Sequence, residues 1–174
     1  EHDGADFETL KLHPNLLKGI HHLGFLRPTP IQARAIPPIL EGRDVIGLAQ
    51  TGTGKTAAFV LPILHRLLQS HARKMPRALI VAPTRELALQ SMDHLKNLSR
   101  YVHLKGHPIF GGVPMNPQIR ALAQGLDIVS ATPGRLPLSI SSFSACSYSR
   151  CSFTGTERVG FFGSFRSAFS MSTG

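Results

Sequence analysis

Residues 45–56 constrain the fold of this chain more than any other segment. Their sequence is Val-Ile-Gly-Leu-Ala-Gln-Thr-Gly-Thr-Gly-Lys-Thr, and the apolar residues 45–49 predict a parallel strand buried on both faces. Gly52 and Gly54 permit a tight turn in which successive backbone N–H groups point into one concavity at a helix N-terminus. Anions bind at such a place, so the segment predicts a phosphate-binding loop between a strand and a helix.

The residues that follow the glycines match this interpretation. Lys55 places a compact positive charge where β- and γ-phosphates would lie, and the hydroxyl of Thr56 is placed to ligate Mg²⁺. One departure is Ala49, which stands where the general pattern has glycine. The alternative is an ordinary glycine turn followed by a lysine on the surface, and the rest of the chain has to decide between the two.

Composition limits the class of protein. The chain has 174 residues, 42% of them hydrophobic, which suits one domain with its own core. Its net charge of +9 fits either a polyanionic partner or an ordinary basic surface. Cys146 and Cys151 both lie late in the sequence, so we do not expect a disulfide framework. We expect a reducing, cytoplasmic location instead. Neither a signal peptide nor a membrane span is predicted.

Strands and helices are expected to alternate through most of the chain. A short amphipathic helix ends at Gly24, and the helix after the phosphate-binding loop runs to about Gln69. Further strands are predicted at 77–82, 107–110 and 126–131, with helices after the first two. This alternation predicts an α/β fold with a mostly parallel sheet and helices on both faces. The loops after the strands would share one rim of the sheet.

Residues 24–32 form a loop stiffened by prolines that leads into a helix. The amide of Gln32 offers the donor and acceptor pair that complements adenine, and an aromatic ring such as Phe7 or Phe25 would stack on the base. The alternative is a glutamine exposed at a helix end and two phenylalanines in the core.

The loops after the later strands carry hydroxyl groups, glycine backbone N–H groups that no side chain covers, and guanidinium groups. Proteins use these groups to hold a phosphodiester backbone without reading bases. Taken singly, each loop is better explained by turn glycines, helix caps and surface arginines. The residues concerned are Thr84, Arg85, Gly111, Gly112, Thr132, Gly134 and Arg135.

Together, these segments resemble the DEAD-box ATP-dependent RNA helicases, in particular the first, RecA-like domain of bacterial-type members. Phe7 resembles the upstream aromatic residue of that family, residues 24–32 the Q motif, and residues 49–56 motif I. Residues 83–88 resemble motif Ia, Gly111-Gly112 the GG motif, and residues 132–135 motif Ib, all in family order. The family also explains Ala49, because its phosphate loop commonly begins with alanine.

The resemblance implies a nucleotide site, an RNA site and a Mg²⁺ ion bound with ATP through Thr56. Gln32 would read adenine and Phe7 would stack on it. The implied ATP-binding residues are Phe7, Phe25, Arg27, Gln32, Ala49, Gln50, Thr51, Gly52, Thr53, Gly54, Lys55 and Thr56. The implied contacts to the RNA backbone, independent of base sequence, come from Pro83, Thr84, Arg85, Gly111, Gly112, Thr132, Pro133, Gly134 and Arg135.

The resemblance is expected to end near residue 136. The Asp-Glu-Ala-Asp motif should follow at about residues 150–160, but no acidic pair occurs there. Residues 137–174 hold 11 Ser, six of the ten Phe and one acid, Glu157. We therefore expect a RecA-like domain over 1–136, incomplete at its C-terminal side, and an irregular tail over 137–174 from a shifted reading frame or a replacement. A genuine low-complexity segment is the alternative.

The missing acids bear on activity, because the family uses them to hold Mg²⁺ and to position the attacking water. The catalytic set is therefore expected to be incomplete. The resemblance also implies a second RecA-like domain that brings arginine fingers, and we do not expect residues 1–174 to form it. The sequence favours a nucleotide- and RNA-binding first domain of a helicase that does not itself turn over ATP. The alternatives are a non-catalytic RNA-binding module and an aberrant product made unstable by an open sheet edge.

Overall fold

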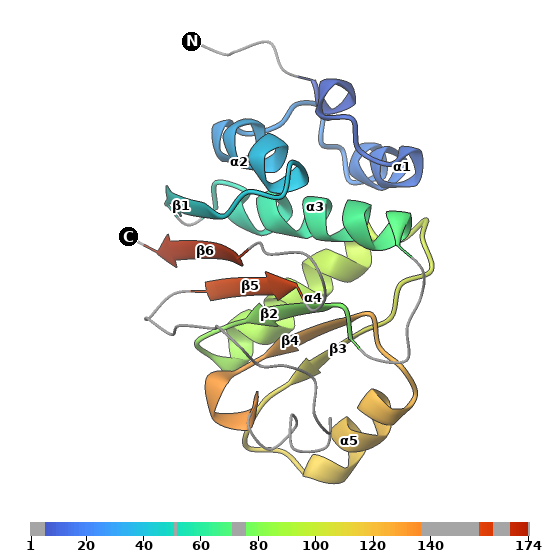
Figure 1. Cartoon of the computed structure of the whole chain (residues 1–174), viewed down its shortest axis with the longest axis vertical. Coiled ribbons are helices and arrows are strands. Elements are labelled where there is room, and N and C mark those ends of the chain that lie inside the picture. Colours follow the sequence, from blue (N-terminus) through green and yellow to red (C-terminus); the bar gives the residue numbers. More distant parts are fainter. Residues whose placement is uncertain (1–5, 51, 71–75, 137–156, 162–167, 174) are drawn as a thin grey trace.

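The computed structural model describes residues 6–50, 52–70, 76–136, 157–161 and 168–173, and shows an α/β architecture (Figure 1). The elements before the last strands follow the predicted order closely. The helices are η1 (Phe7–Leu10), α1 (Pro14–His22), α2 (Pro30–Leu40), α3 (Lys55–Gln69), α4 (Arg85–Leu98), α5 (Met115–Ala123) and η2 (Pro133–Arg135). The strands are β1 (Val45–Ala49), β2 (Ala78–Val81), β3 (Gly106–Ile109), β4 (Ile128–Ala131), β5 (Glu157–Phe161) and β6 (Ala168–Thr173).

The described strands form one sheet in the order β1-β6-β5-β2-β4-β3 (Figure 1). β1 runs parallel to β6, and β2, β4 and β3 run parallel to one another. β5 is antiparallel to both of its neighbours, so the other five strands share one direction. The prediction of a mostly parallel sheet is confirmed.

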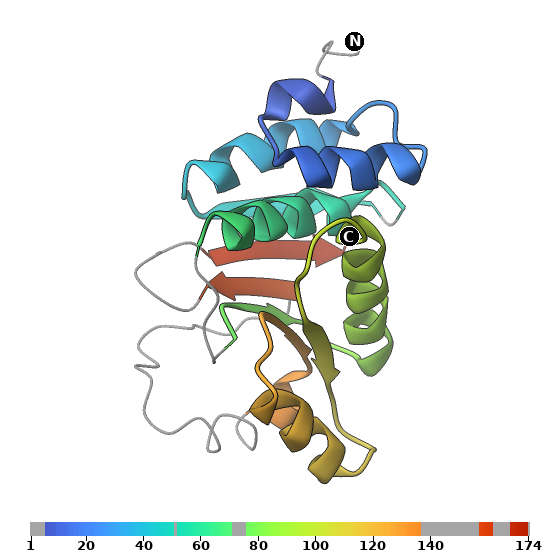
Figure 2. The same ribbon diagram turned by 90° about the vertical axis from the view of Figure 1, so that its right-hand side faces the viewer.

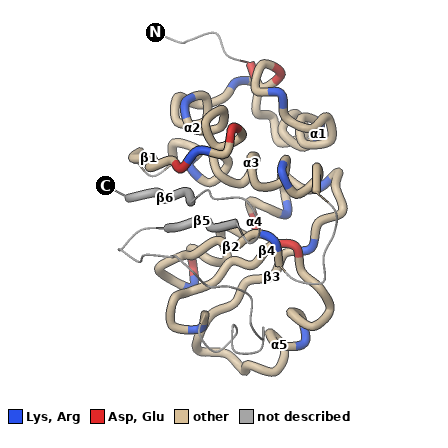
Figure 3. Tube along the Cα trace, in the orientation of Figure 1, with Lys and Arg blue, Asp and Glu red and all other residues tan. Residues whose placement is uncertain are grey.

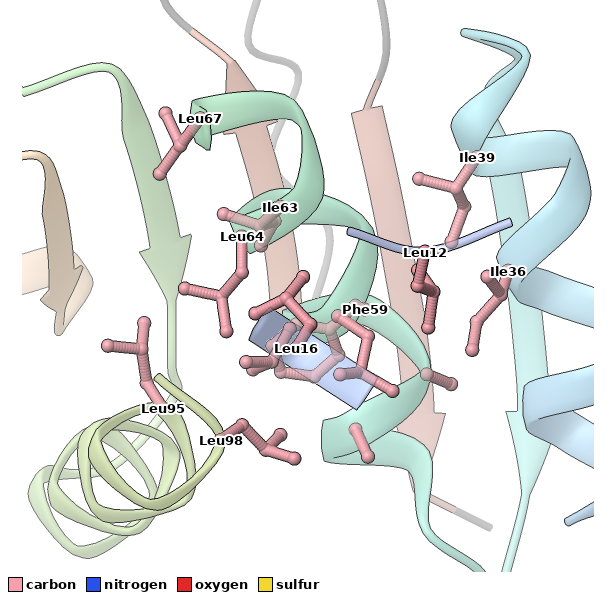
Figure 4. Packing of buried hydrophobic residues seen from close by; sticks show 14 of the residues in the cluster. Leu12, Leu16, Ile36, Ile39, Phe59, Ile63, Leu64, Leu67, Leu95 and Leu98 are labelled. Carbon is pink, nitrogen blue, oxygen red and sulfur yellow. The ribbon is translucent and has the colours of Figure 1, made fainter. Parts of the chain in front are cut away.

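Helices cover both faces of the sheet, as predicted. Helices α3 and α4 pack in one cluster with Ala78, Ile80 and Ile128, whereas Leu122 of α5 packs with Leu79 and other residues of the opposite face. The alternation of side chains along β2 and β4 separates these two clusters. Figure 2 shows α3 and α4 against the sheet from the side. In Figure 4 the side chains of α3 meet those of α1, α2 and α4 in the larger cluster.

The N-terminal helix was predicted well from its spacing. Pro14 occupies the first helical position of α1, where its missing N–H costs nothing, and Leu16 and Ile20 are fully buried. Gly24 follows the helix in a left-handed conformation, with φ of 74°. The helix therefore ends where a glycine was expected to end it.

Strand β1 differs from the prediction, because it is an edge strand and is not buried on both faces. Ile46 is 80% exposed and Leu48 is 72% exposed. A continuous apolar run has the same sequence pattern whether or not a second layer covers it, so periodicity does not distinguish the two cases. Gly47, which faces the other side, is buried.

The tail also differs from the expected irregular conformation, since residues 157–161 and 168–173 form β5 and β6 between β1 and β2. The open edge expected after motif Ib is thus occupied by these two strands. Strand pairing uses backbone groups that any sequence supplies, and the absence of a side-chain period did not exclude it. Residues 137–156, 162–167 and 174 lie outside the described part, and the division of the chain at residue 136 stays a prediction.

A buried ion pair joins the starts of β2 and β4. Nη2 of Arg77 donates to Oδ1 of Asp127 at 2.5 Å, and the two side chains are only 8% and 14% exposed. Nη1 of Arg77 also donates to the carbonyl of Leu67 at 2.9 Å, and Oδ2 of Asp127 accepts from the backbone N–H of Lys105 at 2.9 Å. The pair therefore connects the end of α3 with β2, β4 and the segment before β3.

A histidine pair links α1 to α3 and makes stability depend on pH. Nδ1 of His65 accepts from the backbone N–H of His13 at 3.0 Å, so the neutral imidazole fits the site. Burial lowers the pKa of His65, and the charges of His13 and Arg66 lower it further. Because its pKa in the folded chain lies below that in the unfolded chain, the unfolded state binds more protons between the two values.

We therefore expect the stabilisation from neutral His65 to be complete above pH of about 6.5 and to be lost as pH falls below it. Urea unfolding at several pH values measures the slope. His65→Asn should reduce this slope, whereas His94→Asn on the exposed side of α4 serves as the matched control. Burial and Lys96 also lower the pKa of His107, so part of the slope should remain. An unchanged slope in His65→Asn would contradict the assignment.

Candidate functional site

The loops predicted to carry function lie on one rim of the sheet. β1, β2, β3 and β4 all point the same way, so the loops that follow them leave from the same edge (Figure 1). β2, β4 and β3 are neighbours, which places their three loops side by side. The glycine-rich loop after β1 lies farther along this rim, separated from them by β6 and β5.

The glycine-rich loop has the backbone that a phosphate-binding turn requires. Gly52 and Gly54 have φ of 83° and 84°, in the left-handed region, and α3 begins directly afterwards at Lys55. Nζ of Lys55 donates to the carbonyl oxygen of Ala49 at 2.5 Å, so its ammonium group lies over the loop. The hydroxyl of Thr53 donates to the carbonyl of Gln50 at 2.7 Å.

Two threonines of this segment, Thr56 and Thr51, are also predicted to bind the nucleotide. Thr56 lies in the first turn of α3 and is partly buried, and its contact with Mg²⁺ stays a prediction. Thr51 lies outside the described residues. The helix start and the two left-handed glycines fit a polyphosphate, because together they orient backbone N–H groups and a cation toward one place.

Gln32 is tied to the glycine-rich loop. Its Oε1 accepts from the backbone N–H of Thr29 at 3.0 Å, and its Nε2 donates to the carbonyl of Gly54 at 3.1 Å. The side chain therefore bridges the start of α2 and the start of α3, and the residue is 3% exposed. These bonds use one of two N–H groups and one of two lone pairs. At 3% exposure the remaining donor and acceptor are covered in this conformation, so a base edge would reach them only after the loop has moved.

The aromatic and basic residues near Gln32 are arranged differently from the expectation. The structure buries Phe7 in the main core at 1% exposure, so its ring does not face a base in this conformation. Phe25 is 39% exposed. Arg27 is exposed, and its Nε lies 3.8 Å from Oδ1 of Asp6. Of the two candidate aromatic residues, Phe25 is therefore the one whose ring is accessible.

The loops after β2 and β3 contact each other through Arg85 and Phe110. Thr84 is the N-cap of α4, where its Oγ1 accepts from the N–H of Leu87 at 3.3 Å, and Pro83 beside it is exposed. The guanidinium carbon of Arg85 lies 4.8 Å from the centre of the Phe110 ring, a cation–π distance. Arg85 is itself exposed, so its charge is available at the rim.

The glycines after β3 are bracketed by contacts from the loop after β4. Nη2 of Arg135 donates to the carbonyl of Val113 at 3.1 Å, and the N–H of Thr132 donates to the carbonyl of Ile109 at 3.0 Å. Gly111 and Gly112 are exposed between these points, and an added Cβ would meet nothing within 4 Å at either. Pro133 and Gly134 are also exposed, at the start of η2. The three loops thus form one connected surface.

Sequence reasoning missed Gln118 on α5, which is 6% exposed and bonds both backbone groups of Phe110. Its position in a helix gave no signal, because the pairing depends on how α5 folds back on β3.

In the described part of the chain, Lys and Arg side chains are spread along helices and loops from α1 to α5 and do not form one continuous basic patch (Figure 3).

Two further properties concern membranes and metals. Among the described helices, none is both long and apolar enough to cross a membrane. Within the same described ranges, no three His, Cys, Asp or Glu side chains gather as metal ligands would. The Mg²⁺ predicted to contact Thr56 would not need such a cluster of side chains, because it would bind together with the nucleotide phosphates.

Comparison with known proteins agrees with these features. The family profile described as "DEAD/DEAH box helicase" matches residues 29–154, which extends past residue 136, where we expected the resemblance to end. The chain is 48% identical over 136 residues to the ATP-dependent RNA helicase DeaD of Buchnera aphidicola subsp. Schizaphis graminum, covering 78% of this chain and 22% of that protein. It is 50% identical over 132 residues to the ATP-dependent RNA helicase SrmB of Escherichia coli, covering 75% of this chain and 30% of that protein.

A eukaryotic relative gives the same result. The ATP-dependent RNA helicase DDX54 of Mus musculus is 48% identical over 130 residues, which are 75% of this chain and 15% of the relative. The chain thus spans less than a third of the length of these relatives. The family profile covers more than half of the chain, and it includes the glycine-rich loop and the three neighbouring rim loops. This chain belongs to the DEAD/DEAH box helicase family.

Proposed function

We propose that this chain is the nucleotide- and RNA-binding first domain of a DEAD-box RNA helicase whose whole protein hydrolyses ATP and unwinds RNA. The observation that carries the proposal is the common rim, which holds the glycine-rich loop after β1 and the three linked loops after β2, β4 and β3. The names of the relatives, which are ATP-dependent RNA helicases, support the same assignment. A cytoplasmic location stays a prediction.

The nucleotide half of the proposal assigns ATP to the loop after β1. Backbone N–H groups of the loop and the start of α3 would hold the phosphates together with Lys55, whose ammonium would exchange the Ala49 carbonyl for a phosphate oxygen. Thr56 would ligate the Mg²⁺ that accompanies ATP, and Gln32 would meet the adenine edge. Phe25, as the accessible ring, would supply the stacking surface.

The chain itself is not expected to turn over ATP at a useful rate. No acidic pair occurs at residues 150–160, where the family's Asp and Glu were expected, and Glu157 alone does not replace them. Without a carboxylate that holds Mg²⁺ through water and a base that orients the attacking water, the developing charge and the nucleophile are both unassisted. Binding and hydrolysis should therefore separate in this chain.

The test of the nucleotide site is thermal unfolding with and without Mg²⁺ and ATP. At ATP near 100 times its Kd we expect a stabilisation of about 2.7 kcal/mol in the unmodified chain and none in Lys55→Ala. Lys18→Ala, on the exposed side of α1, is the matched control and should keep the shift. Absence of a shift in the unmodified chain would refute nucleotide binding, and RNA binding without it would favour a non-catalytic RNA-binding module.

The RNA half of the proposal predicts a specific effect at Gly111. Because an added Cβ meets nothing there and φ is not positive, Gly111→Ala should leave the free energy of unfolding within about 0.5 kcal/mol of the original. It should nevertheless weaken binding of single-stranded RNA several-fold, since a methyl group would stand where the RNA backbone approaches. Fluorescence anisotropy at low salt measures this.

Gly112 provides the comparison for Gly111. Its φ of 81° is in the left-handed region, so Gly112→Ala should cost about 1–2 kcal/mol of stability as well as affinity. Affinity for RNA should also fall steeply with salt, as expected for contacts to phosphates. Unchanged RNA affinity in Gly111→Ala would remove this glycine pair from the binding surface.

A further inference from the structure

Gln118 makes an unusual pair of bonds at the end of β3. Its Oε1 accepts from the backbone N–H of Phe110 at 3.2 Å, and its Nε2 donates to the backbone carbonyl of Phe110 at 3.1 Å. A side-chain amide that binds both groups of one residue continues the strand pairing for one position beyond Ile109, the last residue of β3. The backbone of Phe110 is therefore held by α5.

Phe110 also contacts a residue of another loop, the loop after β2. The residue is 9% exposed, it directly precedes Gly111 and Gly112, and the guanidinium of Arg85 lies 4.8 Å from its ring centre. Gln118 packs on one side of the sheet with α5, whereas Arg85 opens α4, whose buried side chains pack on the other side. Phe110 contacts both residues.

We infer that Gln118 is a positioning residue for RNA binding, which acts through Phe110 on Arg85. This inference rests on the proposed function, because it takes Arg85 to be an RNA contact. Gln118 is buried and does not itself reach the rim surface. By binding the N–H and the carbonyl of Phe110, Gln118 fixes the backbone of that residue and therefore the position of its ring. The ring in turn restricts the rotamers of Arg85, which is otherwise exposed. An arginine already ordered loses less entropy when it binds a phosphate.

A purely structural role for Gln118 predicts something different. Buried amides need partners, and Gln118 would satisfy that need by bonding Phe110 even if nothing bound at the rim. Its loss would then lower stability and weaken RNA binding to the same degree whether or not Arg85 is present. A positioning role predicts that the effect on RNA disappears once Arg85 has been removed.

The experiment is a double-mutant cycle on the full chain with a fluorescein-labelled oligouridylate of about ten nucleotides at low salt. Gln118→Leu keeps the size of the side chain and removes both bonds. We expect it to weaken RNA binding about three- to tenfold in the original background and less than twofold in Arg85→Ala. The ATP-dependent rise in melting temperature should be the same in all four proteins.

A second substitution keeps the test informative if Gln118→Leu folds poorly. Phe110→Leu retains the backbone groups that Gln118 binds but removes the ring under Arg85, so it should reproduce the weakening and should also lose its effect in Arg85→Ala. Equal weakening in both backgrounds, or no weakening by either substitution, would overturn the positioning role. An original chain that binds ATP but no RNA would instead overturn the RNA half of the proposed function, and this inference with it.

Discussion

Asp127→Ala is expected to lower the free energy of unfolding by about 3–5 kcal/mol. The substitution leaves the guanidinium of Arg77 buried, at 8% side-chain exposure, without the carboxylate that lies 2.5 Å from it. It also removes the acceptor of the Lys105 backbone N–H. A buried charge that loses its partner is costly because water does not replace the partner. A loss of this size is a large part of the stability of an ordinary domain.

Two further substitutions separate the causes of this loss. Asp127→Asn keeps the shape of the side chain and one of the two acceptor oxygens but removes the charge. It can therefore keep one of the two hydrogen bonds that Asp127 accepts, from Arg77 or from Lys105, and it should cost less than alanine does. Asp93→Ala is the matched control, because Asp93 pairs with Lys96 at 3.8 Å on an exposed face. Exposed pairs contribute little, and the control should stay within about 0.5 kcal/mol of the original. Urea unfolding followed by circular dichroism gives all three values.

The partner substitution tests whether the pair or the single charge matters. Arg77→Met combined with Asp127→Leu replaces both charges by apolar groups of similar length, and it should recover part of what Asp127→Ala loses. If Asp127→Ala costs less than about 1 kcal/mol, the carboxylate does not stabilise the junction of β2, β4 and α3 as the geometry implies.

The parts of the fold that were predicted correctly are those that local pattern determines. Helix α1 has its proline at the first position and its glycine after the end, and α3 ends at Gln69 as its apolar spacing indicated. The rim was also predicted, because alternating strands and helices force the loops of parallel strands to one edge. These inferences need only neighbours along the chain.

The features of the fold and the site that were not predicted from the sequence depend on contacts between residues far apart in the chain. Arg77 and Asp127 are 50 positions apart, and neither belongs to a pattern that would distinguish a buried pair from two surface charges. The burial of Phe7 and the exposure of Leu48 depend on which layers cover them, which side-chain periodicity does not record. The strands of residues 157–161 and 168–173 occupy a place that only the assembled sheet defines. Gln118 was missed for the same reason.

Gly54→Ala is the second substitution with a large expected effect. An added Cβ would clash with Nε2 of Gln32, and the backbone φ of 84° is already unfavourable for alanine. Strain of the left-handed backbone costs about 1–2 kcal/mol, and overpacking adds about 1–3 kcal/mol. We therefore expect both lower stability and loss of the ATP-dependent rise in melting temperature, because the loop and Gln32 have to move apart.

Gly52→Ala is the matched control for backbone strain. Its φ of 83° is nearly the same, but an added Cβ meets nothing within 4 Å. The difference in stability between Gly54→Ala and Gly52→Ala therefore measures the clash with Gln32 rather than the left-handed backbone. If the two substitutions cost the same, the close packing of Gln32 against the loop does not contribute.

Adding Gln32→Ala to Gly54→Ala separates packing from recognition. The smaller side chain removes the clash, so the double substitution should be more stable than Gly54→Ala alone. It also removes the bond from Gln32 to the Gly54 carbonyl and the amide proposed to meet adenine, so ATP should still fail to raise the melting temperature. Recovery of the ATP response would show that Gln32 only fills space beside the loop. Loss of the ATP response in Gln32→Ala alone, where the backbone of Gly54 is unchanged, would mean that one amide both supports the phosphate-binding turn and serves the base.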